Sequence, residues 1–372
     1  MLGVYIHVPF CLRKCPYCSF YSVRFDEGTA EKYVDAVCRN ISRYAGRGLI
    51  ADTLYFGGGT PSVLSPEQVA RIVEKCRQVF LLDNAEITLE ANPCSVSEKK
   101  LYELRRIGVN RLSFGIQSSN DQRLDFLGRL HDWKTAVTAV KNAYNAGFEN
   151  ISGDIMLGAA GEDTESLRTT IDQLCGLPLK HISAYMLKVE EGTPFFSDKY
   201  INLIADDELM SDLYLTAVES LEQHGFKQYE ISNFAKDGYQ SRHNNKYWLG
   251  EEYLGFGPAA HSFFEGRRFC CPPDIGGFIG NSSQHCEVTE SAPDKAEEYI
   301  MLGLRLCKGI SLDRVGELFS GSAADRVRAL AKMYASHGLA YLDNDIISLT
   351  PKGFLVSNSI ISEFIDKCYD GK

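Results

Sequence analysis

The chain has 372 residues, a formal net charge of −10 and an apolar fraction of 44%. This length can form one large core with a smaller second domain. No apolar run is long enough to span a membrane and no basic leader precedes one, so we expect a cytoplasmic protein. The acidic balance argues against a nucleic-acid partner, which needs clustered lysine and arginine. Twelve cysteines in a chain of this length favour reduced thiols and one metal site over a disulfide framework.

Short apolar runs alternate with amphipathic helical patterns through the first half of the chain. Strands are predicted at residues 2–8, 53–56, 86–90, 111–116, 151–156 and 181–186. Helices are predicted between them at residues 30–44, 66–79, 97–107, 133–146 and 164–174. This alternation predicts an α/β fold with a parallel sheet and helices outside it. Because six units are fewer than the eight of a closed barrel, we expect a partial (β/α)6 barrel whose site lies at the carboxyl ends of the strands.

The composition changes after a further helix predicted at residues 206–224. Residues 242–261 are rich in glycine, asparagine and aromatics and have no helical period. From residue 294 helical patterns return, and they end in a hairpin predicted at residues 339–342 and 346–349. The sequence therefore predicts three parts. These are a barrel over residues 1–232, a connecting region over 233–293, and a small helical, winged-helix-like domain over 294–372.

Three cysteines lie close together directly after the first predicted strand. Cys11, Cys15 and Cys18 have the spacing C-x3-C-x2-C, and Phe20 follows where a fourth cysteine could stand. A [4Fe–4S] cluster normally takes four cysteines, so three would leave one iron open to a small-molecule ligand. The alternative is a zinc site completed by His7 or by a remote residue. The spacing favours the cluster.

Polar or glycine-rich segments follow several predicted strands. The second strand is followed by Gly57-Gly58-Gly59-Thr60-Pro61, and Glu90 and Gln117 end the third and fourth strands, whereas Asp154 lies within the fifth. Consecutive glycines let a backbone approach a ligand closely, although a tight turn is the simpler explanation. Arg129 can pair with a carboxylate through two hydrogen bonds, or form an ordinary surface ion pair. Polar groups on one rim are what a polar cofactor pocket requires.

Together these stretches resemble the oxygen-independent coproporphyrinogen III oxidase family of radical S-adenosylmethionine (SAM) proteins. The resemblance rests on residues 5–11, 15–18, 57–62, 89–93, 113–117 and 229–233, and covers essentially the whole chain. It implies that Cys11, Cys15 and Cys18 hold a [4Fe–4S] cluster. The residues that it implies as SAM contacts are Tyr5, Tyr17, Gly58, Gly59, Thr60, Glu90, Gln117, Arg129 and Asp154.

The family contains two functions. The oxidase proper has a further cysteine at the position of Phe20 and a long N-terminal extension, whereas four residues precede Tyr5 here. The stretch His243-Asn-x-x-Tyr-Trp248 is similar to the haem-binding motif of the haem-chaperone (HemW) branch. The resemblance therefore implies a protein that binds a cluster, SAM and haem, and delivers haem to haem-dependent, respiratory apoproteins, including membrane-associated ones. The alternative is radical decarboxylation of coproporphyrinogen III.

The same resemblance implies a haem site around the motif. His243 is the expected iron ligand, with Tyr247 and Trp248 lining the site. Arg242 or Lys246 would then face the propionates. A histidine among aromatics is, however, more often a packed and hydrogen-bonded side chain.

Overall fold

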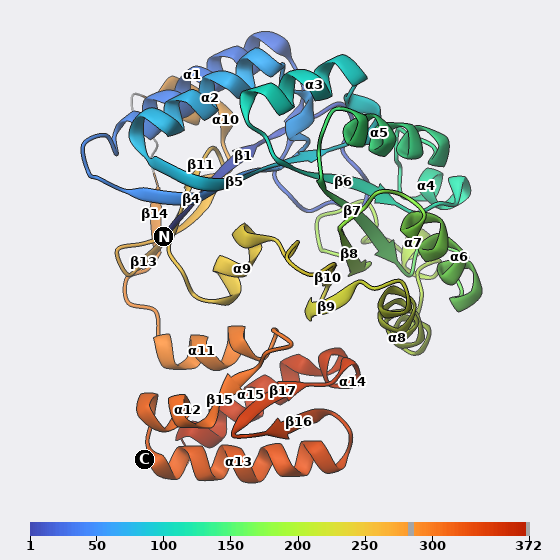
Figure 1. Cartoon of the computed structure of the whole chain (residues 1–372), viewed down its shortest axis with the longest axis vertical. Coiled ribbons are helices and arrows are strands. Elements are labelled where there is room, and N and C mark those ends of the chain that lie inside the picture. Colours follow the sequence, from blue (N-terminus) through green and yellow to red (C-terminus); the bar gives the residue numbers. More distant parts are fainter. Residues whose placement is uncertain (282–285, 370–372) are drawn as a thin grey trace.

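The computed structural model describes residues 1–281 and 286–369, and its main unit is one open twelve-stranded sheet (Figure 1). Six parallel strands form its centre in the order β1-β4-β5-β6-β7-β8. They are β1 (Leu2–Val8), β4 (Ile50–Gly58), β5 (Leu81–Ala91), β6 (Arg111–Gln117), β7 (Asn150–Leu157) and β8 (His181–Met186). The predicted partial (β/α)6 barrel is confirmed.

Helices cover the outer face of these strands (Figure 1). They are α1 (Glu27–Ser42), α2 (Pro66–Val79), α3 (Glu98–Ile107), α4 (Asp121–Phe126), α5 (Trp133–Asn145), α6 (Thr164–Cys175), α7 (Asp198–Ile201) and α8 (Asp207–Gln223), with the short α10 (Ile275–Gly280) beside α1. Local sequence fixes their ends. Ser65 and Gln68 form a reciprocal capping box at the start of α2, and Gly108, with φ of 109°, ends α3 in the left-handed conformation.

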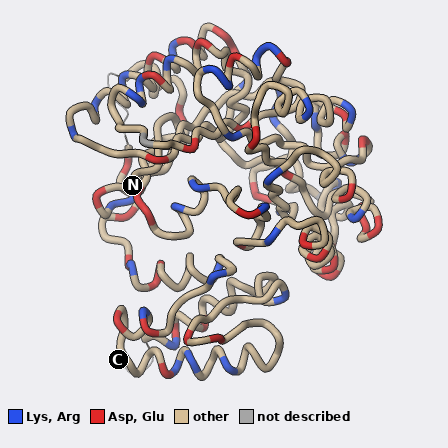
Figure 2. Tube along the Cα trace, viewed as in Figure 1, with Lys and Arg blue, Asp and Glu red and all other residues tan. Residues whose placement is uncertain are grey.

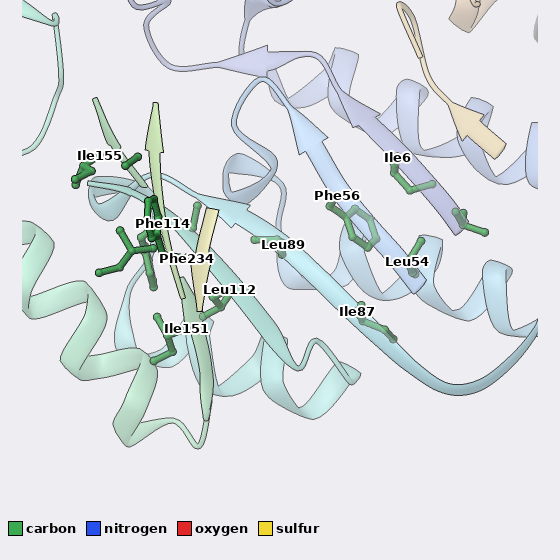
Figure 3. Packing of buried hydrophobic residues seen from close by; sticks show 14 of the residues in the cluster. Ile6, Leu54, Phe56, Ile87, Leu89, Leu112, Phe114, Ile151, Ile155 and Phe234 are labelled. Carbon is green, nitrogen blue, oxygen red and sulfur yellow. The ribbon is translucent and has the colours of Figure 1, made fainter. Parts of the chain in front are cut away.

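Strand alternation separates a buried apolar face from a polar one. The side chains of Ile6, Phe56, Leu89, Leu112 and Phe114 are fully buried in the core (Figure 3). Each such side chain contributes roughly 1.5–3 kcal/mol to folding. Because successive side chains of a strand point to opposite faces, their neighbours in sequence face the interior of the curved sheet. The barrel cavity is therefore built from the residues between the core positions.

Six further strands extend the sheet at both ends. Beyond β8 lie β10 (Asn233–Ala235) and β9 (Lys227–Glu230). Beyond β1 lie β11 (Tyr253–Phe256), β12 (His261–Phe264), β13 (Arg267–Cys270) and β14 (Glu287–Glu290). Strand β11 pairs in parallel with β1, which places residues far apart in sequence side by side.

Residues 242–261 contain a helix although their sequence has no helical period. Helix α9 (Arg242–Trp248) begins after Ser241, whose hydroxyl accepts a hydrogen bond from the Asn244 amide. It has seven residues, about two turns, which is too short to show an amphipathic period. Figure 1 shows α9 between the sheet and the C-terminal domain.

The C-terminal domain combines helices with the predicted hairpin. Its helices are α11 (Lys295–Gly303), α12 (Leu312–Leu318), α13 (Gly321–Ser336), α14 (Pro351–Leu355) and α15 (Ser357–Tyr369), and its sheet has the order β15 (Ile310–Ser311), β17 (Ile346–Leu349), β16 (Ala340–Asp343). Asn344 and Asp345 have φ of 45° and 64°, as a two-residue type I′ turn requires. Backbone hydrogen bonds join the domain to the barrel, including one of 3.0 Å from the Ile231 amide to the Arg305 carbonyl.

Charged residues of both signs are interspersed along the outer helices (Figure 2). Among the described residues, no helix is long and apolar enough to cross a membrane.

Candidate functional site

A cavity of about 550 Å³ opens inside the barrel at the carboxyl ends of the parallel strands. Gly58, Glu90, Gln117, Met156 and Met186 line it, one each from β4 to β8. These strand ends converge on one rim, as expected for a parallel α/β sheet.

The cysteine loop lies at the mouth of this cavity, and its base is closed by backbone hydrogen bonds. Cys11 ends β2 (Phe10–Cys11), which pairs with β3 (Val23–Arg24). The Phe25 amide donates to the Cys11 carbonyl at 2.9 Å, and the Cys18 amide donates to the Cys15 carbonyl at 3.1 Å. The three thiols are unpaired and half-buried, and Cys18 lines the cavity itself.

Two hydrogen-bond donors approach the cysteine sulfurs. The Thr60 hydroxyl lies 3.5 Å from Cys11 Sγ, and Arg129 Nη1 lies 3.3 Å from Cys15 Sγ. Donors and a cation beside sulfur stabilise the thiolate, which is the form that ligates an iron–sulfur cluster. This donor set, with three half-buried thiols in one loop, fits a three-cysteine [4Fe–4S] site.

The zinc alternative needs His7 or a remote residue as a fourth ligand, and both ring nitrogens of His7 already have hydrogen-bond partners. His7 Nε2 lies 3.0 Å from the Tyr21 carbonyl oxygen, and Nδ1 lies 3.2 Å from the Tyr5 hydroxyl. Burial also lowers the pKa of His7. Within residues 1–281 and 286–369, no three His, Cys, Asp or Glu side chains are arranged to hold a single metal ion. His7 therefore acts as a structural side chain.

The glycine segment packs against the cysteine loop as well as lining the cavity. A Cβ on Gly59 would lie 2.7 Å from the Phe10 carbonyl oxygen, and one on Gly58 would lie 2.6 Å from the His7 ring. The Gly59 amide donates to the Val8 carbonyl at 2.9 Å. These glycines are required because β4 approaches the start of the cysteine loop too closely for any side chain.

Burial raises the pKa values of two carboxyl groups inside the barrel. It raises the pKa of Glu90 to about 7, an effect that the Tyr55 hydroxyl partly offsets by donating to Glu90 at 2.8 Å. Burial also raises the pKa of Asp154, against hydrogen bonds from Ser183 and Ser113. A cationic ligand placed beside these two groups would favour their ionised forms.

Gln117 and Arg129 carry polar atoms without a partner among the described residues. Gln117 has φ of 72°, an uncommon conformation for a residue with a side chain, and its Oε1 is buried and unsatisfied. Arg129 donates from Nη2 to the Gly115 carbonyl at 2.8 Å, while its buried Nε has no acceptor. Buried polar atoms normally find partners. Their presence on the cavity wall fits a polar ligand bound there.

Most of the residues expected to contact SAM line this one cavity. They are Tyr17, Gly58, Gly59, Thr60, Glu90, Gln117, Arg129 and Asp154. Tyr5 does not line it. Its ring lies next to those of Tyr55 and His243, with centroids 6.2 and 6.3 Å away.

Several cavity residues escaped the sequence prediction. The cavity is also lined by Tyr55, Tyr185, Arg111 and, from α9, Asn244. Arg111 is 1% exposed, and its Nε and Nη1 have no partner among the described residues. An arginine that opens an apolar strand was the available signal. From sequence alone, an aromatic residue within a strand cannot be assigned to the cavity or to the core, because the face of the sheet to which it points is not known.

His243 does not line this cavity and is 1% exposed. Nδ1 lies 2.8 Å from the Thr53 hydroxyl, and Nε2 lies 2.8 Å from the Tyr247 hydroxyl. Burial, with the charge of Lys246 beside it, lowers the pKa of His243 to about 3. Both ring nitrogens are thus occupied, and in this conformation neither is open to iron.

The cations expected to face propionates are also engaged. Lys246 is 4% exposed and pairs with Asp52 and Glu251, each at 2.8 Å. Arg242 pairs with Asp52 at 3.2 Å and donates to the Asn84 carbonyl. The expectation that Lys246 is available to a ligand was wrong, because the helix places it beneath the barrel with two carboxylates.

Comparison with known proteins identifies the family. The radical SAM superfamily matches residues 5–174, and the HemN C-terminal domain matches residues 291–356. The haem chaperone HemW of Bacillus subtilis is 34% identical over 98% of this chain and 99% of its own length. This chain belongs to the HemW family of radical SAM proteins. The Escherichia coli haem chaperone HemW is 32% identical over 98% of both chains.

This chain shares its fold with a solved structure. The structure titled as coproporphyrinogen III oxidase (HemN) from Escherichia coli aligns with a TM-score of 0.82 at 21% identity. The alignment covers 98% of this chain and 89% of that one. The alignment spans both the barrel and the C-terminal domain, and it confirms the fold of both. The radical SAM match implies a [4Fe–4S] cluster and SAM as cofactors.

Proposed function

We propose that the protein is a cytoplasmic haem chaperone that carries a [4Fe–4S] cluster and SAM and delivers haem to haem-dependent apoproteins. The observation that carries the proposal is the similarity to proteins named haem chaperones along 98% of the chain, through the barrel and the C-terminal domain alike. The exposed Phe20, 64% accessible where the oxidase has a further cysteine, supports the same choice. Its clients would be respiratory haem proteins, including membrane-associated ones.

Cys11, Cys15 and Cys18 would hold the cluster at the barrel mouth. Thr60 and Arg129 would donate to the ligand sulfurs and so tune the cluster, as outer partners of metal ligands do. When both groups are bound, the cluster would supply one-electron chemistry to SAM. The protein's part is to hold both groups in a cavity screened from water.

The cavity residues would divide the recognition of SAM among them. Glu90 would pair with the amino group, because its carboxylate is partly buried and the Tyr55 hydroxyl is its one side-chain donor among the described residues. Arg129 would receive the carboxylate on its unsatisfied Nε side. Gln117 and Asp154 offer acceptors for the ribose hydroxyls, while Gly58, Gly59, Thr60 and Tyr17 shape the wall. Tyr5 would act indirectly, by packing against Tyr55.

Iron and chromophore measurements test the cluster assignment. After anaerobic reconstitution the wild type should contain about four irons per chain. Cys11→Ala, Cys15→Ala and Cys18→Ala should each lose the visible chromophore. The control is Cys175→Ala, since Cys175 lies in α6, outside the cavity, and should keep it. Full iron content in all three loop variants would refute the assignment.

Haem titration and a turnover assay separate the chaperone from the oxidase. The proposal predicts stoichiometric haem binding and no formation of protoporphyrinogen IX from coproporphyrinogen III in the presence of SAM and reductant. Turnover without haem binding would contradict it and establish the oxidase function.

A further inference from the structure

A second cavity, of about 850 Å³, lies between the barrel and the C-terminal domain. We call it the interdomain cavity. Leu2 and Ile50 contribute the starts of β1 and β4, so it lies at the opposite end of the strands from the cysteine loop. Trp248 and Leu249 contribute the end of α9. Helix α11 supplies the facing wall, including Leu302.

Part of the wall of the interdomain cavity is made of apolar side chains that are incompletely covered. Phe263, Phe264 and Leu302 line it with Trp248. Ile50, Leu249 and Met1 also line it, and they remain 47%, 46% and 71% exposed. Covering exposed apolar surface is favourable by about 25 cal/mol per Å², and contiguous exposed apolar walls mark ligand sites. A flat, apolar ligand would cover these side chains.

The charges around the cavity favour an anion at its edge. The three carboxylates there already have partners: Glu251 pairs with Lys246 at 2.8 Å, Glu298 pairs with Arg268 at 2.6 Å, and Glu252 accepts a hydrogen bond from the Gly266 amide at 3.3 Å.

Of the three cations of the lining, Arg314 pairs with Glu317 at 2.7 Å, whereas the two lysines have no ion-pair partner among the described residues. Lys295 and Lys308 line the cavity, are exposed, and form no ion pair with any described residue. The cavity therefore combines apolar side chains with two ammonium groups that form no ion pair among the described residues. That arrangement suits an apolar ligand carrying two carboxylates.

We propose that haem binds in the interdomain cavity, with its ring against Trp248 and Leu249 and its propionates toward Lys295 and Lys308. The inference rests on the proposed chaperone function and deepens it by locating the cargo. The cavity volume falls within the range of about 300–1,000 Å³ typical of small-molecule and cofactor sites. Haem and SAM then occupy opposite ends of the barrel.

This location gives His243 a positioning role. Its ring bonds to Thr53 of β4 and to Tyr247 of α9, which fixes the helix beneath the sheet. Trp248 and Leu249 follow directly and line the cavity. His243 thus acts on haem through the helix that it anchors.

A haem titration of the full-length, cluster-loaded protein tests the charges first, with haem absorbance as the readout. The Lys295→Glu/Lys308→Glu variant should bind haem at least about tenfold more weakly, because two attractive contacts become repulsive. The Lys134→Glu/Lys141→Glu variant makes the same charge change on exposed positions of α5. It should bind as the wild type does. Raised salt should weaken binding to the wild type and narrow the difference.

A filling substitution tests the cavity itself. Leu249→Trp adds bulk inside it and should weaken haem binding severalfold, whereas Leu203→Trp should not. Leu203 is a matched control, since it is 50% exposed against 46% for Leu249 and lines neither cavity. A circular dichroism spectrum and melting curve of each variant establish that it is folded.

The outcomes distinguish the two claims. Absence of haem binding by the wild type would refute the chaperone function. A second outcome is that the wild type and all four of these variants bind haem equally well, whereas His243→Ala loses binding and alters the haem absorbance band. That outcome would refute the interdomain site but not the chaperone function.

Discussion

At the scale of single residues, the same physical effect prepares two side chains for different tasks. Burial raises the pKa of Glu90 and lowers that of His243, because it disfavours the charged form of each. Glu90 lies on a cavity wall where a cationic ligand can restore its charge. His243 has two neutral hydrogen-bond partners and remains uncharged. Glu90 is therefore suited to binding, and His243 to holding the fold.

The pKa of Glu90 predicts a pH dependence of SAM binding. With a pKa of about 7, Glu90 is mostly protonated at pH 6 and half ionised at pH 7. The ionised form attracts the amino cation, so SAM should bind about fivefold more tightly at pH 7 than at pH 6. Titration calorimetry at both values measures this.

The matched variants make the assignment specific. Glu90→Gln should bind SAM weakly and with little change between pH 6 and pH 7. Glu149→Gln, which alters an exposed carboxylate outside the cavity, should follow the wild type. An equal pH dependence in Glu90→Gln would show that another group titrates.

At the scale of elements, the cysteine loop depends on its close contact with the end of β4. In Gly59→Ala the added methyl would meet the backbone of Val8 and Phe10 at 2.7–2.9 Å, where neither neighbour can move aside. We expect a loss of about 1–3 kcal/mol in the free energy of unfolding. Iron content should fall too. Urea unfolding and iron analysis measure the two effects.

Gly280→Ala is the control for this substitution. A Cβ at Gly280 meets no atom within 4 Å, and the residue has no positive φ. Its stability should be unchanged or slightly raised. If Gly59→Ala were equally stable, the proposed contact would not control the loop.

The sequence predicted the elements whose periodicity is long enough to read. Strands β1 and β8 and helix α2 begin and end at the predicted residues. Helix α9 was missed because two turns hold too few residues for a period. The side-chain directions of the motif around His243 could not be predicted, because they depend on packing against β4.

At the scale of the whole molecule, two cavities occupy opposite ends of one barrel. Residues at strand ends could be assigned to the first because parallel strands share a direction. The interdomain cavity could not be predicted, since its walls come from both ends of the chain and meet only when the C-terminal domain docks. A haem in the proposed interdomain site would lie at an outer edge, away from the cysteine loop, where a client could receive it.

Haem transfer tests the central claim most directly. The full-length protein, loaded anaerobically with its cluster, SAM and haem, is mixed with membranes from haem-deficient cells that contain apo-forms of respiratory haem proteins. We predict that the membrane fraction regains haem absorbance and that its respiratory haem proteins regain their oxidase activity. Both should recover faster than with free haem. Leu249→Trp should restore less. Haem that stays on the protein, with no activity recovered in the membranes, would contradict the account.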